Sequence, residues 1–461
     1  MPACNPSQRN GPQARRPDPG HRRRRVWLGC LAALGFNGAA ASEAPTGESS
    51  EPFAPTVLVR TELNAVTGAL RYGGSAVDRG ANSAVGFPLL NAFTLNHDSR
   101  LTFDTSFTGR DLVRLRLRSG NFGRSGFFSN PPTPLTRLNV AFQEPLCEAG
   151  AGFCNNTVVT INRAYLQAPL GRVIHISAGS RIMQVDMLPV WPSVYNEAPI
   201  LELFQRAGSA GVYSRRLGSG FGAWWQPKQG LEGLSLAYAY LATQGNSGNP
   251  EIGGLFTAGA GQTSTVQVAF TRPHWNLTAG YSLNGQRALL RGTPLASQLA
   301  AESRGGSISS WSLAGYWQPL HRNWLPTISA GLGYDRLAFS RYPLPGLTGV
   351  STSSWSVGLN WSHAFGPGNS LVMAMGAPAH VIRLEGRDRY PINDAGLAFE
   401  LATRILLTDT FSLTPAVFWL TRPRGAMTAT ADLSEAVEAP EHNSNASLSA
   451  WGALVRATLR F

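Results

Sequence analysis

The chain has 461 residues, of which only 14% are charged, whereas soluble globular proteins usually carry roughly a quarter. Water is therefore not expected to be its only solvent. The formal net charge of +12 suggests nucleic-acid binding, but seven of the arginines lie within residues 1–25. The rest of the chain is only modestly basic, which argues against a nucleic-acid partner.

The amino-terminal segment has the features of an export signal. "RRRR" at 22–25 precedes the short apolar stretch "VWLGCLAALGF" and the small-residue run "NGAAASEA", which predicts a signal peptide over 1–41 with cleavage after Ala41. Cys30 fits a lipoprotein site poorly, because little apolar sequence precedes it. Residues 42–55 are rich in Ser, Pro and Glu and are expected to form a flexible leader. No later stretch of about 18 apolar residues predicts a membrane helix.

From Thr56 onward the dominant hydrophobic period is two. In "HWNLTAGYSL", for example, Trp275, Leu277 and Tyr281 alternate with Asn276 and Thr278, as in a two-faced strand. The pattern predicts strands at 56–72, 92–107, 111–122, 157–167, 171–182, 219–227, 231–242, 262–272, 274–284, 308–318, 325–338, 351–362, 369–379, 394–406, 410–421 and 446–461.

The strand that begins at 111 carries an arginine row, defined as Arg114, Arg116 and Arg118, which alternates with aliphatic residues. An odd number of turn residues before it would place Asp104 opposite Arg114 and Arg100 near Arg118. A charged side chain that faces lipid costs about 2–4 kcal/mol at the bilayer midplane, so the row is expected to face a lumen. It would act as an electrostatic rail for anions, or simply pair with wall carboxylates.

Residues 123–156 are expected to form one long outer excursion, with two further strands as the alternative. Within them, Cys147 and Cys154 would form a disulfide in an oxidising compartment. A zinc site is disfavoured, because two thiolates without a nearby His or further Cys make an incomplete ligand set. No metal or cofactor is predicted.

Residues 181–220 are too long and too apolar for a solvated loop, and their prolines exclude a long helix. We expect a constriction loop that folds inward against the wall; a lid or a subunit contact is the alternative. Its candidate functional residues are Asp186, Trp191, Tyr195, Glu197 and Glu202.

The final strand, "WGALVRATLRF", alternates up to the aromatic terminus Phe461. It is similar to the terminal strand by which bacterial outer-membrane barrels are recognised for insertion, so the barrel-insertion machinery is an expected partner.

Alternation alone also fits a soluble two-sheet sandwich. Here the polar face is mostly Gly, Ala, Ser and Asn, the apolar face is rich in Trp, and short turns alternate with long connections. These features predict an all-β chain, a transmembrane antiparallel barrel of about 16 strands over 56–461, with 18 as the alternative. Residues expected to line its pore are Arg100, Asp104, Arg114, Arg116, Arg118, Arg181, Glu400 and Arg404.

Three segments carry a family resemblance: "LTFDTSFTGRDLVRLRLRSGNF" at 101–122, "NRAYLQAPLGRVIHISAG" at 162–179 and "AGSAGVYSRRLGSGFGAWWQ" at 207–226. With them, residues 56–461 resemble cyanobacterial outer-membrane porins, the group labelled iron-uptake porins and similar to the carbohydrate-selective porin family. The resemblance implies a passive outer-membrane channel and allows a homotrimer. Those porins usually carry a surface-layer-homology domain, whereas here the leader runs almost directly into the first strand, so cell-wall anchoring is not implied.

The function expected first is a general diffusion porin for small ions and hydrophilic solutes, in contact with outer-membrane lipids. The second is a carbohydrate-selective channel in which Tyr195, Trp191 or other loop aromatics stack on sugars. No enzyme motif stands out, although a barrel hydrolase using His175 and a serine is a third class.

Overall fold

The structure, a computed structural model, describes residues 56–78, 80, 82–143, 158–195, 199–285, 290–302, 306–320, 324–386, 392–438 and 445–461. The predicted signal peptide at 1–41, the leader at 42–55, the Cys147–Cys154 pair and Glu197 lie outside the described residues.

Sixteen antiparallel strands of the described chain form a closed barrel, in which β1 pairs with both β5 and β19. The predicted barrel and its count are confirmed, and the described part of 123–156 adds no barrel strand. The strands are β1 (Thr56–Gly73), β5 (Thr94–Ser106), β6 (Leu112–Gly120), β7 (Thr160–Leu170), β8 (Ile174–Met183), β9 (Leu217–Trp225), β10 (Leu234–Ala242), β11 (Gln262–Arg272), β12 (Trp275–Asn284), β13 (Ser307–Trp317), β14 (Thr327–Ala338), β15 (Gly349–Ser362), β16 (Ser370–Glu385), β17 (Ala398–Leu406), β18 (Phe411–Leu420) and β19 (Ser449–Arg460).

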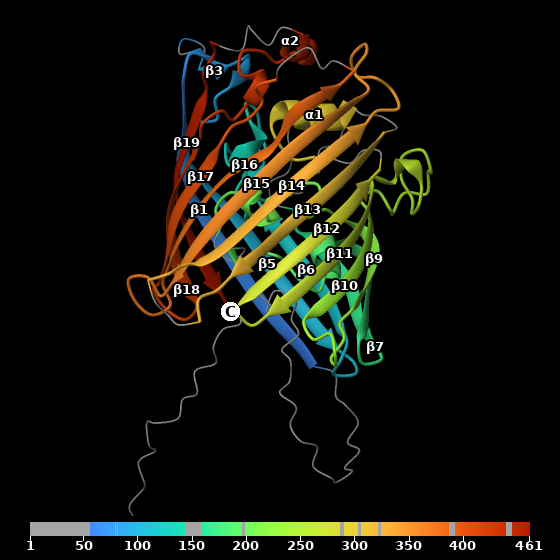
Figure 1. The fold of residues 1–461 in the computed structure, drawn as a ribbon. Helices are drawn as coiled ribbons and strands as arrows, with labels where there is room; N and C mark the ends of the chain where they lie inside the picture. The colour runs from blue at the N-terminus through green and yellow to red at the C-terminus, as the bar shows by residue number, and fades with distance from the viewer. Residues whose placement is uncertain are drawn as a thin grey trace, which may run out of the picture.

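The two ends of the barrel differ. Long connections gather at one end, here called the loop end, and short turns at the other, the turn end, near the carboxyl terminus (Figure 1). The loop end holds α1 (Pro294–Glu302), α2 (Leu433–Glu438) and a small sheet of β2 (Val77–Asp78), β3 (Ser83–Ala84) and β4 (Phe87–Pro88). None of the described helices is long and apolar enough to cross a lipid bilayer.

The strands have two chemically distinct faces. On β12, Trp275 and Leu277 point outward and are 40% and 51% exposed, whereas Thr278 points inward and is fully buried. Outward aromatic rings also meet near both rims: Trp419 stacks on Trp451 at the loop end, with ring centroids 5.0 Å apart, and Phe270 packs against Trp275 at the turn end. An apolar band between two aromatic girdles is the outer surface expected of a barrel in a bilayer.

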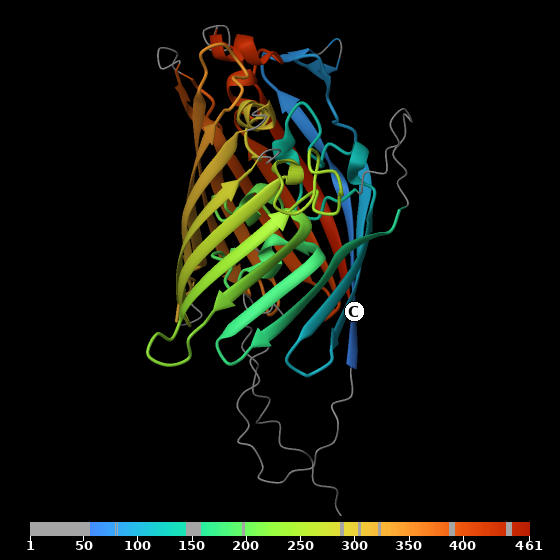
Figure 2. The same cartoon turned by 90° about the vertical axis from the view of Figure 1, so that its right-hand side faces the viewer.

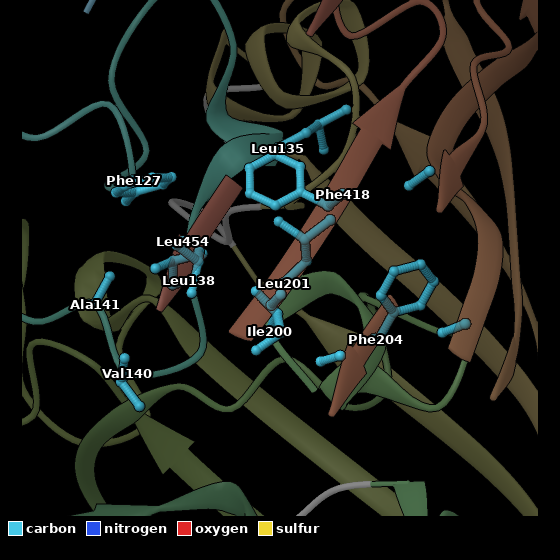
Figure 3. Close-up of a cluster of buried hydrophobic side chains, with 14 of the residues drawn as sticks. Phe127, Leu135, Leu138, Val140, Ala141, Ile200, Leu201, Phe204, Phe418 and Leu454 are labelled. Atoms are coloured by element: carbon cyan, nitrogen blue, oxygen red, sulfur yellow. The ribbon is translucent and has the colours of Figure 1, made fainter. Parts of the chain in front are cut away.

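The interior is more filled than the small polar residues of the sequence suggest. Inward side chains of β1, β18 and β19, among them Leu70, Phe418 and Leu454, are buried against residues of two loop-end connections. Figure 3 shows Leu138 of one connection and Leu201 of the other in this cluster. Apolar loop segments therefore cover part of the inner wall, although the polar face of the predicted strands is mostly Gly, Ala, Ser and Asn.

Candidate functional site

The arginine row lies on the inward face of β6, in the register that the parity argument predicts. Across the β5–β6 pair, the register joins Asp104 to Arg114, Thr102 to Arg116 and Arg100 to Arg118. Five residues, 107–111, separate the two strands. Because alternate residues of a strand are roughly 7 Å apart, the row presents three guanidinium groups at successive heights along the wall.

Carboxylates bind the two outer members of the row. Arg114 donates from Nε and Nη2 to Asp104, at 2.6 and 2.9 Å, and from Nη1 to the Tyr165 hydroxyl at 3.1 Å. Arg118 donates from Nε to Asp98 at 2.5 Å. The same Asp98 also pairs with Arg100 at 2.7 Å.

These wall carboxylates are shared by more arginines than they can neutralise. Asp104 also receives Arg60 of β1, and Arg100 makes a second ion pair, with Glu62, at 2.8 Å. Asp98 and Asp104 thus each accept two guanidinium groups. The wall keeps a positive field, with its carboxylates above and below the middle of the row.

Arg116, in the middle, is bound to a hydroxyl instead of a carboxylate. Its Nε donates to the Thr102 hydroxyl at 2.9 Å, and among the described residues it makes no ion pair. Its neighbour in the β6–β7 register is another arginine, Arg163, whose Nε is paired with Asp186 at 2.6 Å. Arg116 is partly exposed inside the barrel and is the uncompensated charge of the row.

Facing this wall is the inward loop, which connects β8 to β9 and whose described residues are 184–195 and 199–216. Glu400 on the inward face of β17 holds its tip: the Tyr195 hydroxyl donates to the carboxylate at 2.7 Å, and the backbone N–H groups of Ile200 and Leu201 donate at 3.1 and 2.7 Å. Glu400 was expected to line the pore and is instead buried beneath this loop.

Other strands bind the inward loop between its ends. Gln267 of β11 donates to the Val190 carbonyl at 3.0 Å, and Ser354 of β15 donates to the Gly208 carbonyl at 2.7 Å. The loop therefore crosses the barrel, as loop segments between the front and back strands show (Figure 2). The predicted inward fold is confirmed, and an external lid is excluded.

Small inward residues make this crossing possible. At Gly358 of β15, an added Cβ would lie 2.5 Å from the ring of Tyr195. Glycine at this position lets the tyrosine lie flat against the wall. The Gly- and Ser-rich polar face, which the sequence assigns to a crowded lumen, is thus partly a seat for the loop.

A second connection also folds inward, contrary to the expected outer excursion. In residues 121–143, Leu138 forms a β-bridge with Leu201, and the Asn139 N–H donates to the Ile200 carbonyl at 2.8 Å. Phe127 and Leu135 are buried with them (Figure 3). Packing against the inner wall and the inward loop removes the apolar surface of these side chains from water, which stabilises the inward position.

Where the two connections meet, three arginines surround one carboxylate. Glu202 pairs with Arg137 at 2.8 Å, Arg206 at 2.7 Å and Arg291 at 2.6 Å. Burial would raise the pKa of Glu202, but the surrounding guanidinium groups hold it well below its ordinary value. The carboxyl stays ionised at neutral pH, and the cluster remains net positive.

The remaining predicted residues take other positions. The pairing register of β8 shifts against both β7 and β9. As a result Ile182 is the buried, inward residue and Arg181 is paired with Ala164. Arg181 therefore does not join the arginine row. Arg404 lies two positions after the buried Ala402 on β17, so both residues have the same strand parity. The Arg404 side chain is partly exposed. Trp191 is buried, with its ring edge-on to Tyr213 at 5.0 Å.

The residues that sequence reasoning missed are mostly partners of those it found. Glu62 and Asp98 lie in predicted strands, and Asp98 has the same strand parity as Arg100. Once Arg100 is assigned to the inward face, the sequence alone therefore places Asp98 on that face as well. Arg137 and Arg291 lie in long connections, where no periodicity indicates direction.

Comparison with known proteins agrees with the fold. No protein-family model matches the chain. It is 27% identical over 351 residues to an uncharacterized protein of Synechocystis sp. (strain ATCC 27184 / PCC 6803 / Kazusa). The aligned region covers 70% of this chain and 58% of that protein's length. The chain thus spans less than two thirds of this relative.

Two solved structures share the architecture at low identity. A loop-deletion mutant of OmpT, an outer membrane protein of Vibrio cholerae, has a TM-score of 0.51 at 10% identity, over 89% of this chain and 100% of that one. OprB of Pseudomonas putida has a TM-score of 0.53 at 11% identity, over 88% and 94%. At these identities the likeness shows the barrel fold alone.

Proposed function

We propose that the protein is an outer-membrane porin, a passive channel for small ions and hydrophilic solutes that prefers anions. The observation that carries the proposal is the partly exposed Arg116, uncompensated inside a closed barrel whose outer face is apolar. Export through the signal peptide, insertion through the terminal strand and a homotrimer remain predictions that accompany it.

The mechanism is permeation past a positive wall, with the inward loop limiting the open cross-section. One uncompensated charge about 5 Å from a permeant lowers the energy of a monovalent anion by roughly 0.8 kcal/mol in a water-like dielectric. That is about a fourfold enrichment over bulk, and a similar depletion of cations. The Glu202 cluster adds to the same field from the loop side.

Reversal potentials in planar bilayers under a KCl gradient test this proposal. Arg116→Glu should shift the reversal potential toward cations, because it replaces the row charge that makes no ion pair with a described residue. Arg114 is unsuitable, since a carboxylate there would face Asp104. Arg110→Glu, a reversal in the exposed turn of the same hairpin, is the control. Unchanged selectivity in Arg116→Glu would refute the anion preference.

The sugar-channel alternative loses its proposed stacking surface, because Trp191 and Tyr195 are both buried in packed clusters. Block of the current by oligosaccharides would still reveal such a site elsewhere. For the hydrolase alternative, His175 stacks on the ring of Trp224, with centroids 5.4 Å apart. Lipid hydrolysis by the purified protein would reveal that activity.

A further inference from the structure

Arg116 has hydrogen-bonding groups left over as well as charge. Its Nε is bound to Thr102 Oγ1, and neither terminal nitrogen makes a hydrogen bond among the described residues. Thr102 accepts that bond and makes no other side-chain hydrogen bond to the residues that the structure describes, so its hydroxyl hydrogen is free to donate. Two terminal guanidinium nitrogens and one hydroxyl therefore share a short stretch of wall.

The neighbours add charge but few donors. Arg100 and Arg118 are bound to Asp98, and Arg163 is bound to Asp186. Their guanidinium groups raise the local potential without competing for the same ligand atoms. Such a field favours a doubly charged ligand, because its Coulomb energy scales with ligand charge.

The loop side extends this field. Arg118 donates to the Val140 carbonyl at 3.3 Å, and Arg137 donates to the Ala141 carbonyl at 3.0 Å. Consecutive residues of one connection thus join the top of the row to the Glu202 cluster. An anion at the middle of the row has arginines on the wall and on the loop side.

We propose that Arg116 and Thr102 form a binding site for a tetrahedral oxyanion dianion of the phosphate or sulfate class. The inference rests on the proposed channel function and names a preferred permeant for it. The planar guanidinium fork matches two oxygens of such an anion, and the Thr102 hydroxyl, which is bound to Nε of the same guanidinium group, lies beside that fork. Chloride, which has no oxygens to receive the fork, gains only the charge.

The test is block of single-channel chloride current by inorganic phosphate at pH 8 or by sulfate, with acetate as the monoanion. The wild-type channel should be blocked at lower concentrations of the dianions than of acetate. Arg116→Gln should raise the half-blocking dianion concentration about tenfold or more, because hydrogen bonds to a charged ligand are lost. Arg110→Gln, which removes one charge from the exposed turn, should leave it unchanged.

Two further variants keep the inference falsifiable if Arg116→Gln folds poorly. Arg116→Lys keeps the charge without the fork, and Thr102→Val keeps the shape without the hydroxyl; each should weaken block about threefold or more. Dianion block equal to wild type in these variants would overturn the site. If the reversal-potential shift of Arg116→Glu persists in that case, the porin proposal survives; a protein that carries no current refutes the porin itself.

Discussion

Glu400 is predicted to be the latch of the inward loop. Three donors of the loop meet its carboxylate, namely the Tyr195 hydroxyl and the N–H groups of Ile200 and Leu201. Glu400→Ala would leave all three without their acceptor. At about 1–2 kcal/mol for each lost bond, the three together amount to roughly 3–6 kcal/mol of loop-tip attachment. Lumen water that reaches the freed donors makes the net loss smaller than this.

Packing opposes full release of the tip. Ile200 and Leu201 are at most 1% exposed, and burying each side chain contributes roughly 1.5–3 kcal/mol. We therefore expect a loop that detaches transiently rather than one that leaves the lumen. Single-channel recordings of Glu400→Ala should show a larger mean conductance and more frequent current fluctuations.

Tyr195→Phe removes one of the three bonds and should have an intermediate effect. Glu385→Ala is the matched control. Glu385 lies at the loop end of β16, the strand next to β17, and pairs with Arg336 of β14. Among the described residues, its side chain makes no hydrogen bond to the inward loop. Folding is checked by heat-modifiable migration on gels. Conductance and fluctuations in Glu400→Ala that match wild type would refute the latch.

Three other predictions test packing, buried charge and pH. Gly358→Val should displace the Tyr195 ring packed against it and lower the free energy of unfolding by about 1–3 kcal/mol, which a lower unfolding temperature would show. Gly248→Ala, at a position with open space around it, should leave the unfolding temperature unchanged. Arg163→Gln removes the ion-pair partner of Asp186 and should lower the free energy of unfolding in denaturant by about 3–5 kcal/mol. Arg460→Gln, which breaks a half-exposed ion pair with Glu62, should lower it by less than about 1 kcal/mol. Burial raises the pKa of Asp394, in the connection between β16 and β17, to about 6. The folded protein therefore holds this proton more tightly than the unfolded chain does. The resulting stability is present below about pH 4 and is lost as the pH rises through about 6. Limited proteolysis between pH 4 and 7 should show this dependence, and Asp394→Asn should remove it.

Strand parity was the most informative signal in the sequence. It predicts the Asp104–Arg114 pairing and the strand count, because a period of two fixes the face of every residue once one face is assigned. It fails at Arg181, where register shifts exchange the two faces. A bulge inserts one residue without a mark in the hydrophobic pattern.

The loops were harder to predict, for a different reason. Composition indicates that 181–220 folds inward, but it does not indicate which wall receives it, so Glu400 was assigned to the open pore. Residues 123–156 lack regular alternation, so the sequence predicts an outer excursion there, whereas the described part up to residue 143 folds inward. Contacts such as Leu138 with Leu201 join segments distant in sequence, and no local pattern encodes them.

That bridge also constrains how the channel moves. Arg137 and Glu202 are bound through both side chain and backbone, so the two connections form one mechanical unit although they arise from different hairpins. Widening the channel by moving one connection alone would break the Leu138–Leu201 bridge and expose apolar side chains of both connections. Lengthening the connection within residues 121–143 should therefore alter gating by the inward loop. None of these residues donates a hydrogen bond to the Glu400 carboxylate in the described part of the chain.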